Sequence, residues 1–251
     1  MSIPSQSPGV TWAGMSLPTV APIGDPDWFV VVDNIVGWWD GLSETGQSTA
    51  VEHWSGMGAL ETEPRYTARV VEIVGSIVAK PGNMVAAWDA IRTRRRGVLR
   101  VDENDMGVAK LGDAVKSDFR PAHISEQLSR FSLYLRLADP LRYGAGTRAL
   151  PNGVNLIPNA GDESAFPTLT LTGPHDAVTI DHPGGSFMID PLAVGTWVFD
   201  FRNGDAWTTA GARVFGVTSG SQPVVDPGGS SWSVSGLGAG SATLSRFEAW
   251  T

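Results

Sequence analysis

Turn-forming residues interrupt the second half of this sequence at short and regular intervals. From Thr168 onward, strand-sized runs alternate with Gly, Pro, Asn and Asp clusters about every eight to twelve residues, which is the rhythm of an all-β sandwich. The Asn203-Gly204 pair, between the aromatic run 197–199 and Trp207, predicts a β-hairpin. The whole chain contains 30 Gly and 17 Pro, scattered rather than gathered in one tract. Such punctuation favours many short strands over a few long helices.

A boundary between two domains is predicted near residue 150. Leucines alternate with polar residues over 133–137, as in a half-buried strand, and Asp139-Pro140 ends that strand because proline has no amide hydrogen for a ladder. Residues 141–158 follow as a spacer without sustained periodicity. The formal charge is −2 up to residue 150 and −6 beyond it, which indicates two different surfaces. We therefore predict one domain over residues 1–147 and a second over 148–251.

The first domain is expected to consist of strands with one helix among them. The aromatic and Val-rich residues 28–39 predict two strands separated by a turn at Asp33-Asn34, and residues 66–74 predict a strand of mixed burial. Further strands are predicted within residues 97–140, around a polar turn at Asn104-Asp105. This pattern fits either an α+β domain or a β-sandwich with an added helix.

The helix is predicted within residues 81–97, where Asn83 is expected to cap the first turn and Gly97 to end the last in the left-handed conformation. Its apolar face is predicted to contain Met84, Val85, Trp88 and Ile91. The basic residues near its C-terminus complement the helix dipole: Arg92, Arg94, Arg95 and Arg96. An anion-binding role for these arginines is one interpretation, and a solvated or subunit-contacting face is the simpler one.

Composition excludes several classes of protein. Without cysteine the chain can have no disulfide framework, no cysteine zinc site and no thiol catalysis. It has no apolar run long enough to span a membrane and no secretion signal at its start, so we expect a soluble chain without an export route. A net charge of −8 argues against a protein that grips nucleic acid phosphates.

The titratable residues offer two weak candidates for a site. His175-Asp176 and Asp181-His182 could hold a metal, but they are expected to flank a strand and so to lie at its opposite ends. Asp102, Glu103 and Asp105 could form a calcium loop or a general acid and base, although the downstream Glu of a calcium loop is missing and a polar turn explains them more simply. The remaining histidines, His53 and His123, have no partners at catalytic or ligand spacing. We therefore predict no catalytic residue, no cofactor and no metal site.

The order of several elements resembles one known family. The segments are ADP-x-x-Y over residues 138–143, NAG-D over 159–162, the proline-led strand 167–174, a strand reaching WVFD at residue 200, and a final strand near residue 251. Together they are similar to the distal tail proteins of long-tailed, siphovirus-type bacteriophages, which are also described as minor tail proteins. The resemblance extends from about Trp28 to Thr251, and it depends on order and spacing rather than on one diagnostic motif.

The resemblance implies a mainly β chain: an N-terminal β-sandwich with one short α-helix that forms a ring, then a galectin-like β-sandwich. It implies a structural virion protein at the distal tail tip, assembled in the bacterial cytoplasm as a homohexameric adaptor ring without enzymatic activity. The implied partners are the tail tube protein and the tip or baseplate hub protein, with the tape measure and receptor-binding proteins as further candidates. DNA would only pass through the lumen, and no membrane insertion is expected.

A carbohydrate-binding protein is the alternative function. In that case exposed aromatic residues of the second sandwich, such as Trp207 or Trp232, would stack on sugar rings. The His, Arg and Trp arrangement by which true galectins hold galactose is absent from the sequence, so the galectin-like description concerns architecture only.

Overall fold

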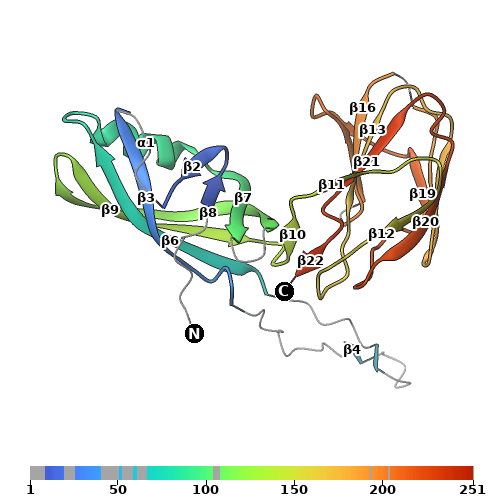
Figure 1. Ribbon diagram of the computed structural model, residues 1–251, viewed down its shortest axis with the longest axis horizontal. Helices are drawn as coiled ribbons and strands as arrows, with labels where there is room; N and C mark the ends of the chain where they lie inside the picture. The colour runs from blue at the N-terminus through green and yellow to red at the C-terminus, as the bar shows by residue number, and fades with distance from the viewer. Residues whose placement is uncertain are drawn as a thin grey trace. The chain divides into compact units, whose positions relative to one another are not determined.

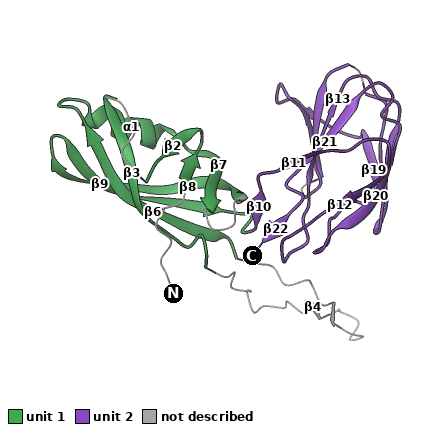
Figure 2. Ribbon diagram, viewed as in Figure 1, with its two compact units in different colours: residues 1–140 green, residues 141–251 purple. Residues whose placement is uncertain are grey.

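The computed structural model describes residues 9–19, 26–40, 51–52, 59–60, 67–103, 108–192, 194–202 and 204–250. These residues form a mainly β chain with one helix among them, as the sequence predicts. The chain divides into two compact units, residues 1–140 and 141–251 (Figure 2). The units divide directly after Asp139-Pro140. A domain boundary at residue 147 stays a prediction.

Unit 1 contains nine strands and a helix in the described residues. Their bounds are β1 Gly9–Trp12, β2 Met15–Leu17, β3 Trp28–Val36, β4 Val51–Glu52, β5 Ala59–Leu60, β6 Arg69–Ala79, α1 Met84–Thr93, β7 Arg96–Glu103, β8 Val108–Ser125 and β9 Leu128–Leu137. All but β4 and β5 belong to one antiparallel sheet in the order β2-β1-β7-β8-β9-β6-β3, which we call the large sheet.

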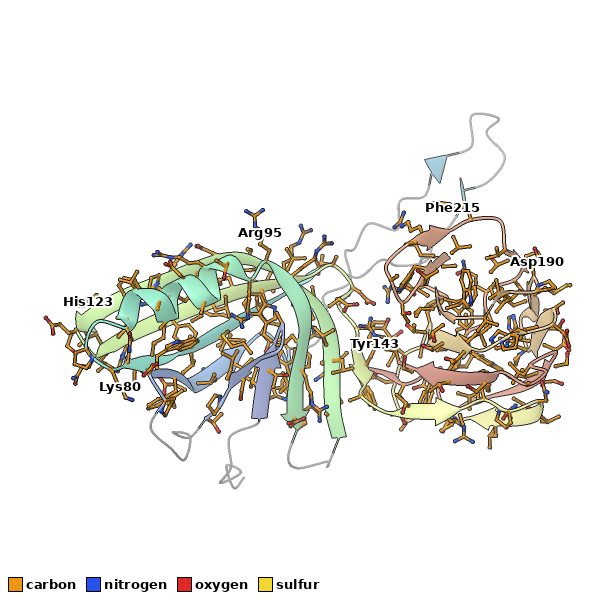
Figure 3. All side chains as sticks on the ribbon, turned by 90° about the horizontal axis from the view of Figure 1, so that it is seen from above. Lys80, Arg95, His123, Tyr143, Asp190 and Phe215 are labelled. Atoms are coloured by element: carbon orange, nitrogen blue, oxygen red, sulfur yellow. The ribbon has the colours of Figure 1, made fainter. Side chains whose placement is uncertain are left out.

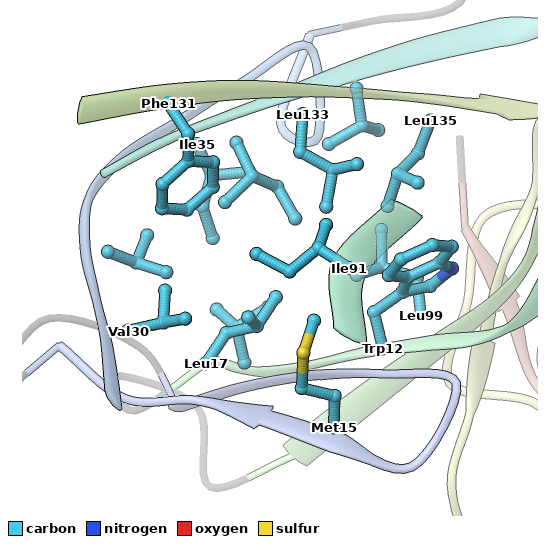
Figure 4. Packing of buried hydrophobic residues seen from close by; sticks show 14 of the residues in the cluster. Trp12, Met15, Leu17, Val30, Ile35, Ile91, Leu99, Phe131, Leu133 and Leu135 are labelled. Atoms are coloured by element: carbon cyan, nitrogen blue, oxygen red, sulfur yellow. The ribbon is translucent and has the colours of Figure 1, made fainter. Parts of the chain in front are cut away.

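The large sheet curves around a single hydrophobic core. The amide of Val32 on β3 donates to the carbonyl of Pro18 just after β2, at 2.8 Å, so the two ends of the sheet come together. Helix α1 packs on the concave side (Figure 1). Figure 4 shows Ile91 of α1 in the middle of the core, between Leu133 of β9 and Leu17 of β2. Fully buried aliphatic and aromatic side chains of this kind are the main source of the unit's stability.

Two strand predictions for this unit are wrong in detail. Residues 28–36 form one strand, because the register shift between Val32 and Asn34 is a β-bulge that takes up Asp33 without a turn. The strand β6 alternates strictly between buried and more exposed residues rather than showing mixed burial. The buried side of β6 begins with Arg69, although arginine side chains are usually exposed.

The helix is where it was predicted, but its buried face and its ends differ. Met84, Ala87 and Ile91 are buried, whereas Val85 is 60% exposed. Asn83 occupies the N-cap position without a side-chain capping bond, and the C-cap residue after the helix, Arg94, has an extended conformation. Gly97 is already in strand β7, where a Cβ atom would lie 2.6 Å from the Cα of Ala13. Gly97 therefore allows close packing of two backbones and is no helix cap.

Unit 2 is a β-sandwich. Its strands are β10 Arg142–Gly144, β11 Thr147–Ala149, β12 Gly153–Ile157, β13 Thr168–Thr172, β14 Val178–His182, β15 Gly185–Ile189, β16 Thr196–Asp200, β17 Asp205–Thr208, β18 Arg213–Val214, β19 Thr218–Gly220, β20 Ser230–Ser235, β21 Ser241–Ser245 and β22 Ala249–Trp250. One sheet has the order β11-β21-β13-β16-β17-β18 and the other the order β12-β20-β14-β15-β19. The predicted spacer of residues 141–158 is wrong, because it contains β10, β11 and β12.

The two sheets of unit 2 meet through aromatic rings. The ring centroid of Phe201, just after β16, lies 5.1 Å from that of Phe187 on β15 and 6.3 Å from that of Trp232 on β20. Both pairs are close to edge-to-face geometry. The hairpin predicted between the aromatic run and Trp207 is confirmed, with Val198 opposite Trp207. Gly204 adopts the left-handed conformation in its turn, and Asn203 lies outside the described residues. No helix in the described part of the chain is long and apolar enough to cross a membrane.

Candidate interaction surface

The acidic residues at the end of β7 belong to a buried structural cluster. The Nζ atom of Lys110 lies 3.0 Å from Oε2 of Glu103, and both side chains are almost completely buried. Oε1 of Glu103 accepts a hydrogen bond of 3.0 Å from the indole of Trp38, which is fully buried. Asp102 instead binds Arg100 at the surface, and Asp105 lies outside the described residues. Glu103 thus neutralises a buried lysine, which is a structural role rather than that of a catalytic acid.

Arg69, the first residue of β6, is a second buried charge that binds polar groups of the protein. Its guanidinium donates to the carbonyls of Gly37, Trp38, Asp40 and Pro140, at 2.6 to 3.0 Å. These carbonyls belong to non-strand backbone, so a buried five-donor group can satisfy acceptors that no ladder reaches. The two clusters together fix the segment that contains Trp38 and leave Trp39 47% exposed beside it.

The histidines of unit 2 are not gathered with other possible metal ligands in the described part of the chain. The described residues contain no group of three or more His, Asp or Glu side chains placed to hold an ion. His175 is 6% exposed and neither ring nitrogen has a hydrogen-bond partner, whereas Asp176 is exposed. His182 lies at the other end of β14, as the sequence predicts.

His182 and Ser221 are spaced like a nucleophile and its base, but the hydrogen bonds around the ring favour the tautomer that donates to Ser221. Nε2 of His182 lies 3.2 Å from Oγ of Ser221. The amide of Gly184 donates to Nδ1 of the same ring at 3.2 Å, so the proton of the neutral imidazole is on Nε2. Nε2 therefore donates to Ser221, whose carbonyl is 3.1 Å away, and cannot accept the proton of the hydroxyl.

The aromatic candidates for sugar stacking separate into two classes. Trp232 is completely buried between the sheets, so its proposed role in sugar binding is wrong. Trp207 is half-buried on the outer face of the other sheet, opposite Val198 on one side and Arg213 on the other. Arg213 in turn binds Asp205 at 3.0 Å.

The convex face of the large sheet is the surface most suited to an interaction. Helix α1 packs on the concave side, and no described helix or strand of unit 1 covers the convex one. Its members are Phe29, Val31, Asn34 and Val36 of β3; Val70, Glu72, Val74, Ser76 and Val78 of β6; Arg130, Ser132, Tyr134 and Arg136 of β9; and Val115, Asp118 and Arg120 of β8. Three of the valines are half exposed: Val36 at 45%, Val70 at 54% and Val115 at 51%.

A charged network crosses the middle of this face. Arg120 donates to Asp118 at 2.6 Å and lies over the ring of Tyr134. The bond from Arg120, with a second one from the amide of Phe119, lowers the pKa of Asp118. The hydrogen bond to Glu72, together with burial, raises the pKa of Tyr134. These groups satisfy one another, so they supply polarity without needing a partner.

Other cations on the same face are not satisfied. Arg96, Val115, Arg136 and Val70 stand side by side across β7, β8, β9 and β6. Neither the Arg96 nor the Arg136 side chain has a hydrogen bond or ion pair with another described residue, and the two valines in the same row are exposed. Exposed aliphatic side chains beside unpaired arginines are the composition of an interface core, because arginine is enriched there and lysine is not.

The predicted arginine cluster extends this positive charge beyond the end of α1. Nζ of Lys116 donates to the carbonyls of Ile91 and Arg92, which are the unpaired acceptors of the last helical turn. Burial lowers the pKa of Lys116, and Arg95 and Arg92 lower it further. Arg95 points away from the ribbon (Figure 3). The predicted arginines therefore do not act as one group: Arg94 donates to the carbonyl of Ala90, Arg92 pairs with Asp89, and Arg95 faces solvent.

The comparisons with known proteins find similarity in structure and none in sequence. No protein-family profile matches the chain, and no curated protein sequence matches it. The crystal structure of the Dit protein of phage SPP1, described as a paradigm of the hub adsorption apparatus in phages that infect Gram-positive hosts, aligns with a TM-score of 0.55. The alignment has 12% identity and covers 96% of this chain and 99% of that one.

The baseplate of phage p2 contains a second similar fold. Its structures in the activated conformation with Sr and with Ca align with TM-scores of 0.53 and 0.54, at 10% identity over 86% of this chain and 90% of theirs. The similarity to SPP1 Dit extends over both units. The resemblance to distal tail proteins that the sequence suggested is thus confirmed at the level of the fold.

Proposed function

We propose that this chain is a structural, non-enzymatic protein of a phage tail that assembles into a hexameric adaptor ring at the distal end. The observation that carries the proposal is the fold, which is similar to a tail hub protein over 96% of the chain. In this proposal residues 1–147 form the ring and residues 148–251 project from it as a galectin-like sandwich. The ring joins the tail tube to the tip or baseplate hub, and DNA passes through its lumen.

The convex face of the large sheet supports self-assembly. A ring needs two complementary surfaces on each protomer, and at least one of them must bury apolar area. In the row from Arg96 to Val70, exposed valines alternate with arginines whose side chains have no partner within the described residues. A neighbouring protomer that supplies carboxylates and apolar side chains would satisfy both.

The test is the mass and shape of the purified protein. We expect a species of six times 26.6 kDa by light scattering, and a ring with a central hole in negative-stain images. Val70→Lys places a charge among the unpaired arginines and should reduce the ring to smaller species. The control is Val85→Lys, because Val85 is similarly exposed but lies on α1. A wild-type protein that stays monomeric at high concentration would contradict the proposal.

Sugar binding is retained as a second candidate only through Trp207. The half-buried indole beside the Arg213–Asp205 pair offers an apolar surface next to hydrogen-bonding groups, which is what a pyranose ring needs. Binding on a glycan array that disappears in Trp207→Ala would support this function. A blank array with folded wild-type protein would remove it.

A further inference from the structure

Strand β12 is an edge strand without the usual protection against pairing with another chain. It binds β20 on one side, and no described strand binds it on the other. Its sequence, GVNLI, contains no proline and no charge, and its register with β20 has no bulge. The chain has no charged residue between positions 149 and 161. Native edge strands usually carry charge, proline or a bulge, because a bare edge recruits another strand.

The other edges in unit 2 are protected. The strands β11, β18 and β19 have 3, 2 and 3 residues, whereas β12 has 5. Arg148 lies in the middle of β11, Arg213 begins β18, and Gly220 ends β19 in the left-handed conformation. Short length and charge both prevent strand addition, so β12 stands out among the four.

The open edge of β8 in unit 1 shows the same protection on a long strand. The pairing of β7 with β8 stops at Val115, so β7 does not cover the rest of β8. That stretch contains Pro121, two register shifts and the charged pair Asp118 and Arg120. The chain thus protects a long edge where it has one, and β12 is the exception.

The side chains of β12 are apolar on the face that solvent reaches. Val154 is 80% exposed and Leu156 is 67% exposed. Their neighbours across β20 are Ser233 and Ser231, which are too small and polar to cover them. On the opposite face, Asn155 is buried and its side-chain amide binds the carbonyls of Pro151 and Gly153 at 2.9 Å, which holds the strand's first residues in place.

We propose that β12 pairs antiparallel with β12 of a second copy of this chain, about a two-fold axis at Asn155. In this register Val154 lies opposite Leu156 of the partner subunit, and Leu156 lies opposite the partner's Val154. A shift by one residue would place buried Asn155 opposite exposed Val154, on the wrong face of the sheet. A shift of the axis to Leu156 would place Val154 opposite the partner's Pro158. The register at Asn155 is therefore the one that matches both aliphatic residues.

The interface is small, so the pairing of two isolated chains should be weak and the assembly should strengthen it. A single short edge contact buries less than the roughly 1,000 Å² that a stable complex needs. Several copies held together would make several such contacts at once, which multiplies the affinity. The pairing does not require the hexameric ring, and the two proposals can fail separately.

Register-specific disulfide formation tests the pairing directly, because the full chain has no native cysteine. We would purify Val154→Cys and Leu156→Cys separately, then oxidise each alone and as an equal mixture. Cβ atoms of directly opposite residues lie within disulfide reach, whereas diagonal neighbours are about 7–8 Å apart, so the mixture should form at least about fivefold more linked dimer than either variant alone. Val194→Cys, at a site 81% exposed in the same unit, measures random collision.

A second measurement follows self-association without a disulfide cross-link. Leu156→Lys should abolish concentration-dependent self-association of this kind in sedimentation velocity, while Val194→Lys should not. Circular dichroism on both variants confirms that the sandwich is folded. If each cysteine variant alone forms as much disulfide-linked dimer as the mixture, the strands pair in a different register. If no sample forms more linked dimer than Val194→Cys, a strand of another protein, or none, occupies this edge. Either outcome overturns the proposal, whether or not the ring is present.

Discussion

Removing the buried lysine of unit 1 should destabilise it far more than removing the whole ion pair. In Lys110→Met, the carboxylate of Glu103 stays buried with the Trp38 indole as a donor but without the ammonium 3.0 Å away. Removing one member of a buried pair costs about 3–5 kcal/mol, because an uncompensated charge stays out of water. The side chains of Lys110 and Glu103 are 3% and 9% exposed, so little solvent screening reduces this value. We expect a loss of about 3 kcal/mol in the free energy of unfolding of unit 1.

The double variant Lys110→Met with Glu103→Gln separates charge from hydrogen bonding. The glutamine carbonyl can still accept from the indole of Trp38, and the methionine keeps the volume of the lysine stem, so no buried charge is left. Since isosteric replacement of a whole buried pair is often nearly neutral, most of the lost stability should return, leaving about 1 kcal/mol.

Guanidinium unfolding followed by tryptophan fluorescence gives both values. If Lys110→Met lowers the free energy of unfolding by less than about 1 kcal/mol, the pair contributes no more than a solvent-screened surface ion pair, and the reasoning is refuted. A double variant as unstable as the single one would refute it as well, because the loss would then come from packing rather than from charge. An exposed substitution such as Val85→Ala on α1 serves as the reference for normal scatter.

Three further predictions concern backbone packing, carbonyl satisfaction and titration. Gly97→Ala should cost about 1–3 kcal/mol in urea unfolding, because a Cβ would meet the Ala13 backbone, whereas Gly146→Ala, with its nearest atom 3.6 Å away, should be tolerated. Arg69→Met should cost about 3 kcal/mol or more, since it leaves several buried carbonyls unpaired; a midpoint unchanged from wild type would contradict this. Ultraviolet titration, with Tyr134→Phe as the difference, should show Tyr134 ionising above the usual tyrosine range, and Glu72→Gln should bring it down; equal curves would contradict the bond. The folded protein holds the Tyr134 proton more tightly than the unfolded chain does. This interaction therefore stabilises the fold below the pKa of Tyr134 in the unfolded chain, and the stabilisation is lost as pH rises through its pKa in the folded protein.

The period-two pattern and the turn residues predicted most of the strands. Leu133, Leu135 and Leu137 are fully buried as the alternation indicated, and the strands of unit 2 follow the predicted train from Thr168. The strands β1 and β2 were missed, because four and three residues around a turn contain too little alternation to be recognised. Yet Trp12 and Leu17 in them are completely buried, so the core depends on residues without a sequence signature.

The side-chain clusters were beyond sequence reasoning for a different reason. Glu103 was considered as an acid or a calcium ligand because its neighbours in sequence are acidic, but its actual partners are Lys110 on the next strand and Trp38, 65 positions away. For Arg69, the sequence of residues 66–74 predicts a strand of mixed burial and does not indicate that the side containing Arg69 is the buried one. Both errors arise because a charge is read as exposed until its partner is known, and the partner comes from tertiary structure.

The first and last strands of unit 2 lie side by side. Its first strand, β10, pairs with its last, β22, so that Arg142 stands opposite Trp250 and Tyr143 opposite Ala249. Everything between them leaves from this short ladder and returns to it. Exchange of the intervening sandwich for another module would need only two neighbouring splice points. Related chains could in this way differ in the sandwich while the β10–β22 ladder stays the same.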